Sequence, residues 1–307
     1  MRLSSHFARL VAGDSAIGAP TAEAEAARVS TDYVRFIVLA GARTGSTMLV
    51  QALNSSASIT CFGEIFNADV NFVPFNVNGY DNFASQDRAL RDGDWEVFLQ
   101  ERIFGDRPME TKATGFKLLY GQNQDFLGLR DRLAEDDGLR VLHLRRHNLL
   151  RALVSAKIAQ TTGVWVKPNG PPLNGAFTKA NARLAGRHPA RAIASLRRRL
   201  GLALGLRRQQ RVRLSQEECS AMFRFLTARE RRFDEAFDGH ARMTLYYEDL
   251  THHPQDVLNQ VQTFLGVVPE PLDVSVRQNS KPLPDLLENY DELRRAFSGT
   301  PYACFFD

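Results

Sequence analysis

The segment from Val34 to Leu53 constrains the fold of this 307-residue chain more than any other part. Val34–Ala40 is a short apolar run rich in β-branched residues, as is typical of a buried parallel strand. A glycine-containing turn, 41–46, ends the run, and 47–53 has the pattern of a helix. Strand, turn and helix in this order open an α/β nucleotide-binding unit.

Further strands and helices alternate along the rest of the chain. Segments 114–119, 139–144 and 243–247 are predicted strands, and 58–62 is a short strand-like run. Helical patterns occupy 94–104, 125–134, 149–160, 216–237, 254–265 and 283–297. This alternation predicts an α/β fold: a single P-loop-like domain over 31–307, with a central parallel β-sheet flanked by helices. Residues 1–30 are expected to form a loose N-terminal arm.

The positive charge is unevenly placed. The net charge is +4, yet nine arginines and no acidic residue lie between Arg187 and Arg213. We interpret 187–213 as a helical insertion, either a solvated surface or a peripheral membrane contact. Nucleic-acid binding is a weaker alternative, because the segment lacks interleaved aromatic residues and the chain has no zinc-finger or RNP-like signature.

The three cysteines, Cys61, Cys219 and Cys304, are far apart and have no CxxC spacing. They predict neither a disulfide framework nor a zinc site, and a reducing compartment fits them best. No apolar run has the length of a membrane span, and no continuous apolar segment follows the N-terminus. We therefore expect a cytoplasmic protein without a metal.

The turn at 41–47 has the features of an anion site. A turn that enters a helix directs free backbone N–H groups at one point, where the helix dipole favours an anion. Gly45 permits close approach of a phosphate, Ser46 and Thr47 add hydroxyl donors, and Arg43 adds a permanent charge. The alternative is an ordinary strand–helix turn with a surface arginine.

The turn is not a Walker A loop. That loop needs a lysine before its Ser or Thr, and here Ser46 stands in the lysine position. The missing residue is the one that would hold a γ-phosphate, so a nucleotide without a triphosphate is favoured. A P-loop small-molecule kinase remains an alternative, weakened by this absence.

The run Arg43-Thr44-Gly45-Ser46-Thr47 after a strand resembles the 5′-phosphosulfate loop of sulfotransferases that use 3′-phosphoadenosine 5′-phosphosulfate. The resemblance implies that Arg43 neutralises the bridging oxygen and the 5′-phosphate. It also implies that residues 44–47 cradle that phosphate. No metal is required.

A second element resembles the 3′-phosphate site of the same family. An arginine at a strand end and a serine on the next helix match Arg146 and Ser155, with Arg145 as a helper. The gap is one residue longer than in cytosolic members, where the arginine would fall on His147. The late basic loop 277–282 adds Lys281 as a further contact to the 3′-phosphate.

Sulfuryl transfer to a hydroxyl needs a base near the turn. Glu64 lies in 63–67, a stretch similar to bacterial carbohydrate sulfotransferases related to nodulation-factor enzymes, and this resemblance implies that Glu64 is the base. His147 is the rival base, whereas His143 is expected in the core. Lys117, near a strand end, is expected either to neutralise the sulfuryl oxygens or to be structural.

The acceptor is predicted mainly from the branch of the family. The carbohydrate branch implies a hydroxyl of a carbohydrate or glycolipid, and a hydroxylated lipid or secondary metabolite is the alternative. Loops 67–86 and 161–180 are expected to shape the acceptor pocket, and 245–250 is expected to be scaffold. The sequence does not indicate an oligomeric state.

Overall fold

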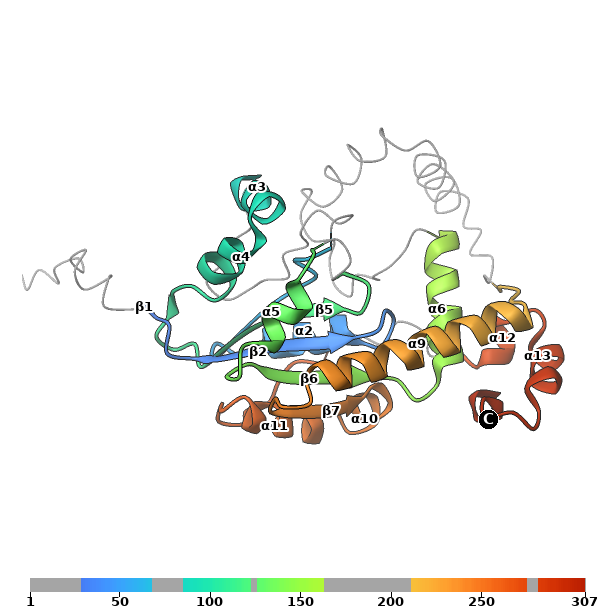
Figure 1. Ribbon diagram of the computed structural model, residues 1–307. Helices are drawn as coiled ribbons and strands as arrows, with labels where there is room; N and C mark the ends of the chain where they lie inside the picture. Colours follow the sequence, from blue (N-terminus) through green and yellow to red (C-terminus); the bar gives the residue numbers. More distant parts are fainter. Residues whose placement is uncertain (1–28, 68–84, 123–125, 163–210, 275–280, 307) are drawn as a thin grey trace, which may run out of the picture.

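A computed structural model describes residues 29–67, 85–122, 126–162, 211–274 and 281–306 (Figure 1). Most of the predicted arm, of the arginine-rich segment and of the two acceptor loops therefore lies outside the described residues. The described ends of the arm and the arginine-rich segment make backbone pairings. Val29–Ser30 (β1) pairs antiparallel with Arg107–Pro108 (β4), and Val212 forms a bridge with Leu287.

Five strands form the central sheet in the order β3-β5-β2-β6-β7, and every neighbouring pair is parallel. This confirms the predicted α/β fold, and each predicted strand lies within one residue of the observed bounds. β2 is in the middle with a helical layer on each face, which explains its continuous apolar sequence. The strands are Ile59–Phe62 (β3), Ala113–Leu119 (β5), Val34–Ala40 (β2), Arg140–Arg145 (β6) and Arg242–Tyr246 (β7).

One face of the sheet is covered by α2, α10 and α11 (Figure 1). Successive side chains of a strand point to opposite faces, so Phe36, Val38 and Ala40 of β2 join this core. They pack with Leu49 and Leu258 from the helices. The helices are Ser46–Leu53 (α2), Tyr247–His252 (α10) and Pro254–Phe264 (α11).

The opposite face carries a second core, in which Ile37 and Leu39 of β2 pack with Phe233 and Phe237. Leu90 of α3 lies at its margin. The predicted helix 94–104 is present, but its second half is a π-helical segment. The helical segments on this side are Ser85–Gly93 (α3), Trp95–Phe98 (α4), Leu99–Ile103 (π), Leu129–Ala134 (α5) and Gln216–Ala236 (α9).

α9 extends beyond the sheet, and its first half carries a third core with helices from the end of the chain (Figure 1). The single helix predicted over 283–297 is wrong. Leu287 is extended because it pairs with Val212, and the Asn289 amide bonds to the backbone of Leu214, so the helix is interrupted. The elements here are Leu149–Thr162 (α6), Leu283–Leu286 (α12), Tyr290–Phe297 (α13) and the 3-10 helix Ala303–Phe306.

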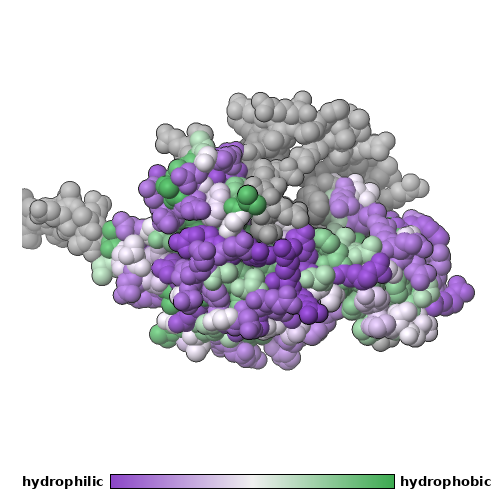
Figure 2. Space-filling view, viewed as in Figure 1, coloured by the Kyte–Doolittle hydropathy of each residue, from purple (hydrophilic) through white to green (hydrophobic). Residues whose placement is uncertain are grey.

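Hydrophilic side chains predominate over the described part of the face drawn in Figure 2, where the hydrophobic areas are small and scattered. Among the described residues, the two most exposed large hydrophobic side chains are Leu127 and Val268, which lie in separate loops. None of the described helices combines the length and the hydropathy that a membrane span requires.

A first prediction concerns Gly115 in β5, which lies opposite Phe36 of β2 and Cys61 of β3. A Cβ atom at Gly115 would lie 2.2 Å from the carbonyl oxygen of Phe36. Because that oxygen belongs to the backbone of the central strand, Gly115→Ala forces the strands apart. We expect the free energy of unfolding in urea to fall by about 1–3 kcal/mol.

The control for this prediction is Gly239→Ala, because a Cβ atom there would meet nothing within 4 Å. Equal urea midpoints for the two variants would contradict the close approach of the strands at Gly115.

Candidate functional site

The turn between β2 and α2 has an unusual backbone. Gly45, the N-cap of α2, has φ 86°, and Arg43 has φ 66°, although it carries a side chain. Such a conformation costs about 1–3 kcal/mol and persists only where surrounding structure enforces it, most often at functional sites. In the part of the chain that the structure describes, no side chain caps α2. The amides of its first turn have no intrahelical acceptor and can therefore bind an anion.

Tyr247, the first residue of α10, lies directly against this turn. A Cβ atom on Gly45 would lie 2.4 Å from the Tyr247 ring, so both the ring and the positive φ demand glycine. The guanidinium of Arg146 lies over the same ring, 4.3 Å from its centroid. The sequence predicts 245–250 as scaffold but gives no sign that Tyr247 forms one wall of the turn.

Two hydroxyl groups of the turn make hydrogen bonds, one within the turn and one to a neighbouring strand. Thr44 is buried, and its hydroxyl donates to the Gly41 carbonyl at 2.9 Å, which closes the turn. Ser46 is also buried, at the start of α2. Thr47 accepts a hydrogen bond from Nζ of Lys117 at 3.1 Å, which joins α2 to β5.

Lys117 and Glu64 form an ion pair beside the turn. Lys117 Nζ lies 2.8 Å from Glu64 Oε1, and their side chains are 2% and 28% exposed, so the ammonium is enclosed while the carboxylate can be reached. Asn67 and Gln122 donate to Glu64 Oε2 at 2.8 and 3.0 Å. Burial raises the pKa of Glu64, but the Lys117 charge and these hydrogen bonds outweigh it and lower the pKa below its ordinary value.

Arg43, Arg146 and Ser155 also meet at the turn. Arg43 Nε donates to Ser155 Oγ at 3.0 Å, and Arg146 Nη1 donates to the Arg43 carbonyl at 2.8 Å. Burial lowers the pKa of both arginines, although each remains a cation at neutral pH. Arg146 Nε is buried without a hydrogen bond in the described structure, its nearest acidic oxygen being Glu248 Oε1 at 3.9 Å.

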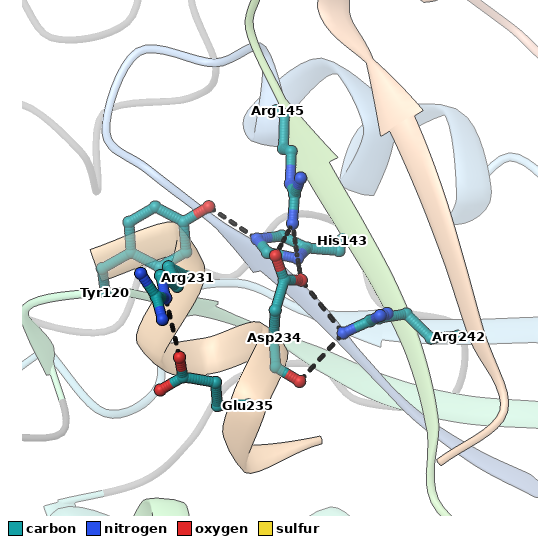
Figure 3. A network of polar contacts seen from close by, with 7 residues as sticks. All are labelled: Tyr120, His143, Arg145, Arg231, Asp234, Glu235 and Arg242. Atoms are coloured by element: carbon teal, nitrogen blue, oxygen red, sulfur yellow. Dashed lines mark hydrogen bonds and ion pairs between the residues drawn. The ribbon is translucent and has the colours of Figure 1, made fainter. Parts of the chain in front are cut away.

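Arg145, the expected helper of Arg146, points to the opposite face of the sheet (Figure 3). It pairs there with Asp234 of α9, which also binds Arg242 of β7 at 3.0 Å. His143 is fully buried in the same network, between the Tyr120 hydroxyl at 2.7 Å and Asp234 at 3.1 Å. His143 therefore lies in the core, as expected, and the structure does not bring Arg145 to the turn.

Two further candidates, His147 and Lys281, lie outside the cluster that is formed by the turn, Lys117 and Glu64. His147 is exposed, stacks on Tyr246 with ring centroids 3.9 Å apart, and donates its backbone N–H to Glu248. Lys281 is exposed, and its carbonyl accepts a hydrogen bond from Arg151 of α6. The rest of the late basic loop, 275–280, lies outside the described residues.

The arrangement concentrates cations around uncapped helix amides. Arg43, Lys117 and Arg146 approach the start of α2, and within the described ranges Glu64 and Glu248 are carboxylates near them. These donors suit a phosphate or sulfate group, and Glu64 is a partly exposed carboxylate next to them. In the described parts of the chain, no three His, Cys, Asp or Glu side chains form a group that could hold a metal ion.

The chain is similar to two nodulation proteins and to one solved structure. Nodulation protein H of Rhizobium tropici is 31% identical to the chain over 284 residues, which cover 89% of this chain and 92% of that protein. Nodulation protein H of Rhizobium meliloti (strain 1021) is 27% identical, with 89% and 94% covered. The crystal structure of a sulfotransferase from Alicyclobacillus acidocaldarius aligns with a TM-score of 0.42 and 15% identity, covering 88% and 93% of the two chains. No protein-family model matches.

The packing of Tyr247 on the turn generates a second prediction. Gly45→Ala should lower the free energy of unfolding, because a left-handed alanine costs about 1–2 kcal/mol and its Cβ collides with the ring. In a Tyr247→Ala background the collision is gone, so the same substitution should cost less. Chemical unfolding of the four proteins in this double-mutant cycle measures the difference. An equal cost in both backgrounds would disprove the proposed contact.

Proposed function

The chain belongs to the nodulation protein H family of sulfotransferases, and we propose that it moves a sulfuryl group from 3′-phosphoadenosine 5′-phosphosulfate to a carbohydrate or glycolipid hydroxyl. The observation that carries the proposal is the double contact of Lys117, whose ammonium binds both Thr47 of the turn and Glu64. One cation thus joins the anion site to a candidate base. This membership also replaces the kinase and nucleic-acid alternatives.

The residues at the turn fit the phosphosulfate nucleotide. Its 5′ side would be held by the first-turn amides of α2 and by Arg43. Because Gly45 has no Cβ, the Tyr247 ring can pack directly against the turn. The nucleotide's 3′-phosphate would be held by Arg146, whose buried Nε lacks a hydrogen bond in the described structure, and by Ser155. When bound, the nucleotide supplies an activated sulfuryl group with a phosphate as leaving group.

The chain's own residues then perform three tasks. Arg43 and Lys117 neutralise the charge that develops on the bridging oxygen as its bond to sulfur breaks. Glu64 takes the proton of the acceptor hydroxyl, whose oxygen forms the new bond to sulfur. The turn holds the donor in place for in-line attack by the acceptor hydroxyl, which removes part of the entropic barrier.

Glu64 is a better base than His147 in this geometry. Glu64 is linked to the turn through Lys117, which contacts both Glu64 and Thr47, and the Glu64 side chain is partly exposed. The ring of His147 is stacked on Tyr246, and among the described contacts none joins it to Lys117 or to the turn. Most of loops 67–86 and 161–180, which are predicted to shape the acceptor pocket, lies outside the described residues.

A third prediction tests the cofactor class. We expect calorimetry without added metal to detect binding of 3′-phosphoadenosine 5′-phosphate, and much weaker binding of adenosine 5′-phosphate and ATP. Arg43→Ala should weaken this binding by about 10- to 100-fold, because it removes a charge-assisted contact worth about 1.5–3 kcal/mol. The control is Arg231→Ala, an arginine on α9 whose side chain is 82% exposed.

Two results would overturn this part of the proposal. One is affinity that does not depend on the 3′-phosphate. The other is wild-type affinity in Arg43→Ala.

A fourth prediction concerns the base. Glu64→Gln should still bind 3′-phosphoadenosine 5′-phosphate but transfer sulfuryl groups about 10²- to 10⁴-fold more slowly, because the amide cannot accept the proton. The measurement is transfer of radiolabelled sulfuryl groups to a panel of oligosaccharides, glycolipids and hydroxylated lipids. If His147→Gln rather than Glu64→Gln loses turnover, His147 is the base.

A further inference from the structure

Gln122 is a buried glutamine just after β5 that connects the backbone of this strand to Glu64. Its Oε1 accepts a hydrogen bond from the Leu119 N–H at 3.0 Å, and its Nε2 donates to Glu64 Oε2 at 3.0 Å. The residue is 6% exposed. Nothing in the local sequence marks it, and it was not among the predicted site residues.

The two contacts fix the orientation of the Gln122 amide. The Leu119 N–H can only donate, so the oxygen of the amide must face it. The NH₂ group is thereby directed at Glu64, and because it can only donate, it requires an acceptor there. If the amide were rotated by 180°, its NH₂ group would face the Leu119 N–H and its oxygen would face the Glu64 carboxylate, so neither hydrogen bond could form.

Gln122 also limits how many acceptor positions Glu64 has left. An ionised carboxylate has about four lone-pair sites. Within the described structure, Lys117 occupies one site on Oε1, while Asn67 and Gln122 occupy two on Oε2. About one site remains, and the 28% exposure of the Glu64 side chain leaves it accessible to an incoming hydroxyl.

We propose that Gln122 is a positioning residue for the reaction: it holds the Glu64 carboxylate so that its remaining acceptor site faces the hydroxyl of the acceptor. The proposal rests on the proposed role of Glu64 as base. Gln122 touches neither the nucleotide nor the hydroxyl in this arrangement and acts only through Glu64.

The electrostatics of Glu64 give the sign of the expected effect. Among the described residues, the charged groups that face it are Lys117 from β5 and Arg43 from the turn, while Asn67 and Gln122 are neutral donors. A donor to the ionised form lowers a carboxyl pKa, so removal of the Gln122 donor should raise the pKa of Glu64. The acid limb of the pH–rate profile should then move to higher pH.

Two variants separate positioning from packing. Gln122→Met preserves length but removes both hydrogen bonds. Gln122→Glu can keep the bond to the Leu119 N–H, and it lacks a donor to Glu64 once its own carboxyl is ionised. Gln260→Glu, on the exposed side of α11, is the matched control for an added carboxyl. The readouts are the titration of the Glu64 carboxyl carbon by NMR in the free protein, binding of 3′-phosphoadenosine 5′-phosphate, and the pH–rate profile.

We expect Gln122→Met to titrate Glu64 at higher pH than wild type, to bind 3′-phosphoadenosine 5′-phosphate unchanged, and to turn over about 10- to 100-fold more slowly. In Gln122→Glu, the new carboxyl and Glu64 should share one proton and titrate in two steps. Its rate should also fall at high pH, where both groups are ionised and the donor is lost. Gln260→Glu should match wild type.

Unchanged titration of Glu64 in both Gln122 variants would overturn the proposal, as would wild-type turnover in both. The NMR titration requires no acceptor, so it decides the contact even if the base is elsewhere. If 3′-phosphoadenosine 5′-phosphate does not bind wild type, the proposed function fails separately. If Gln122→Met does not fold, Gln122→Glu decides the result alone, because it retains the bond to Leu119.

Discussion

The buried ammonium of Lys117 sets the geometry on which the rest of the site depends. A charge that is 2% exposed must be paired, because desolvation without a partner is costly. Its partners are Glu64, which follows β3, and Thr47 in the first turn of α2. Three segments separated in sequence are therefore fixed around one charge. The same pairing keeps Glu64 ionised, since it lowers the pKa that burial alone would raise.

A second constraint comes from the ring of Tyr247, which touches the turn and supports a cation at once. The ring leaves no space for a Cβ on Gly45, and the guanidinium of Arg146 lies over it. A cation over an aromatic face keeps a favourable electrostatic contact without using its N–H donors. Arg146 can thus be held in place and still have a buried Nε without a hydrogen-bond partner in the described structure. The backbone conformation of the turn and the placement of its second arginine are linked through one side chain.

Local sequence patterns were sufficient for the strands and the turn, because apolar runs and glycine placement are local signals. They could not place Tyr247 or Gln122, since their importance arises from contacts with Gly45 and Glu64, which are distant in the chain. The helix predicted over 283–297 failed for the same reason: a backbone pairing with Val212 interrupts it. The roles of Glu64 and Arg43 rest on family resemblance and remain predictions.

The neighbours Arg145 and Arg146 show why sequence alone could not choose between two cofactor arginines. Consecutive residues at a strand end point to opposite faces, so one faces α9 and the other faces α2. On the α9 side, Asp234 pairs with Arg145 and Arg242, and burial together with Arg145 holds the pKa of His143 well below its usual range, so His143 adds no charge at neutral pH. On the α2 side, Arg146 Nε lies 3.9 Å from Glu248 Oε1, too far for a hydrogen bond. Of the two neighbouring arginines, only Arg146 therefore lies on the face where the helix amides already favour an anion.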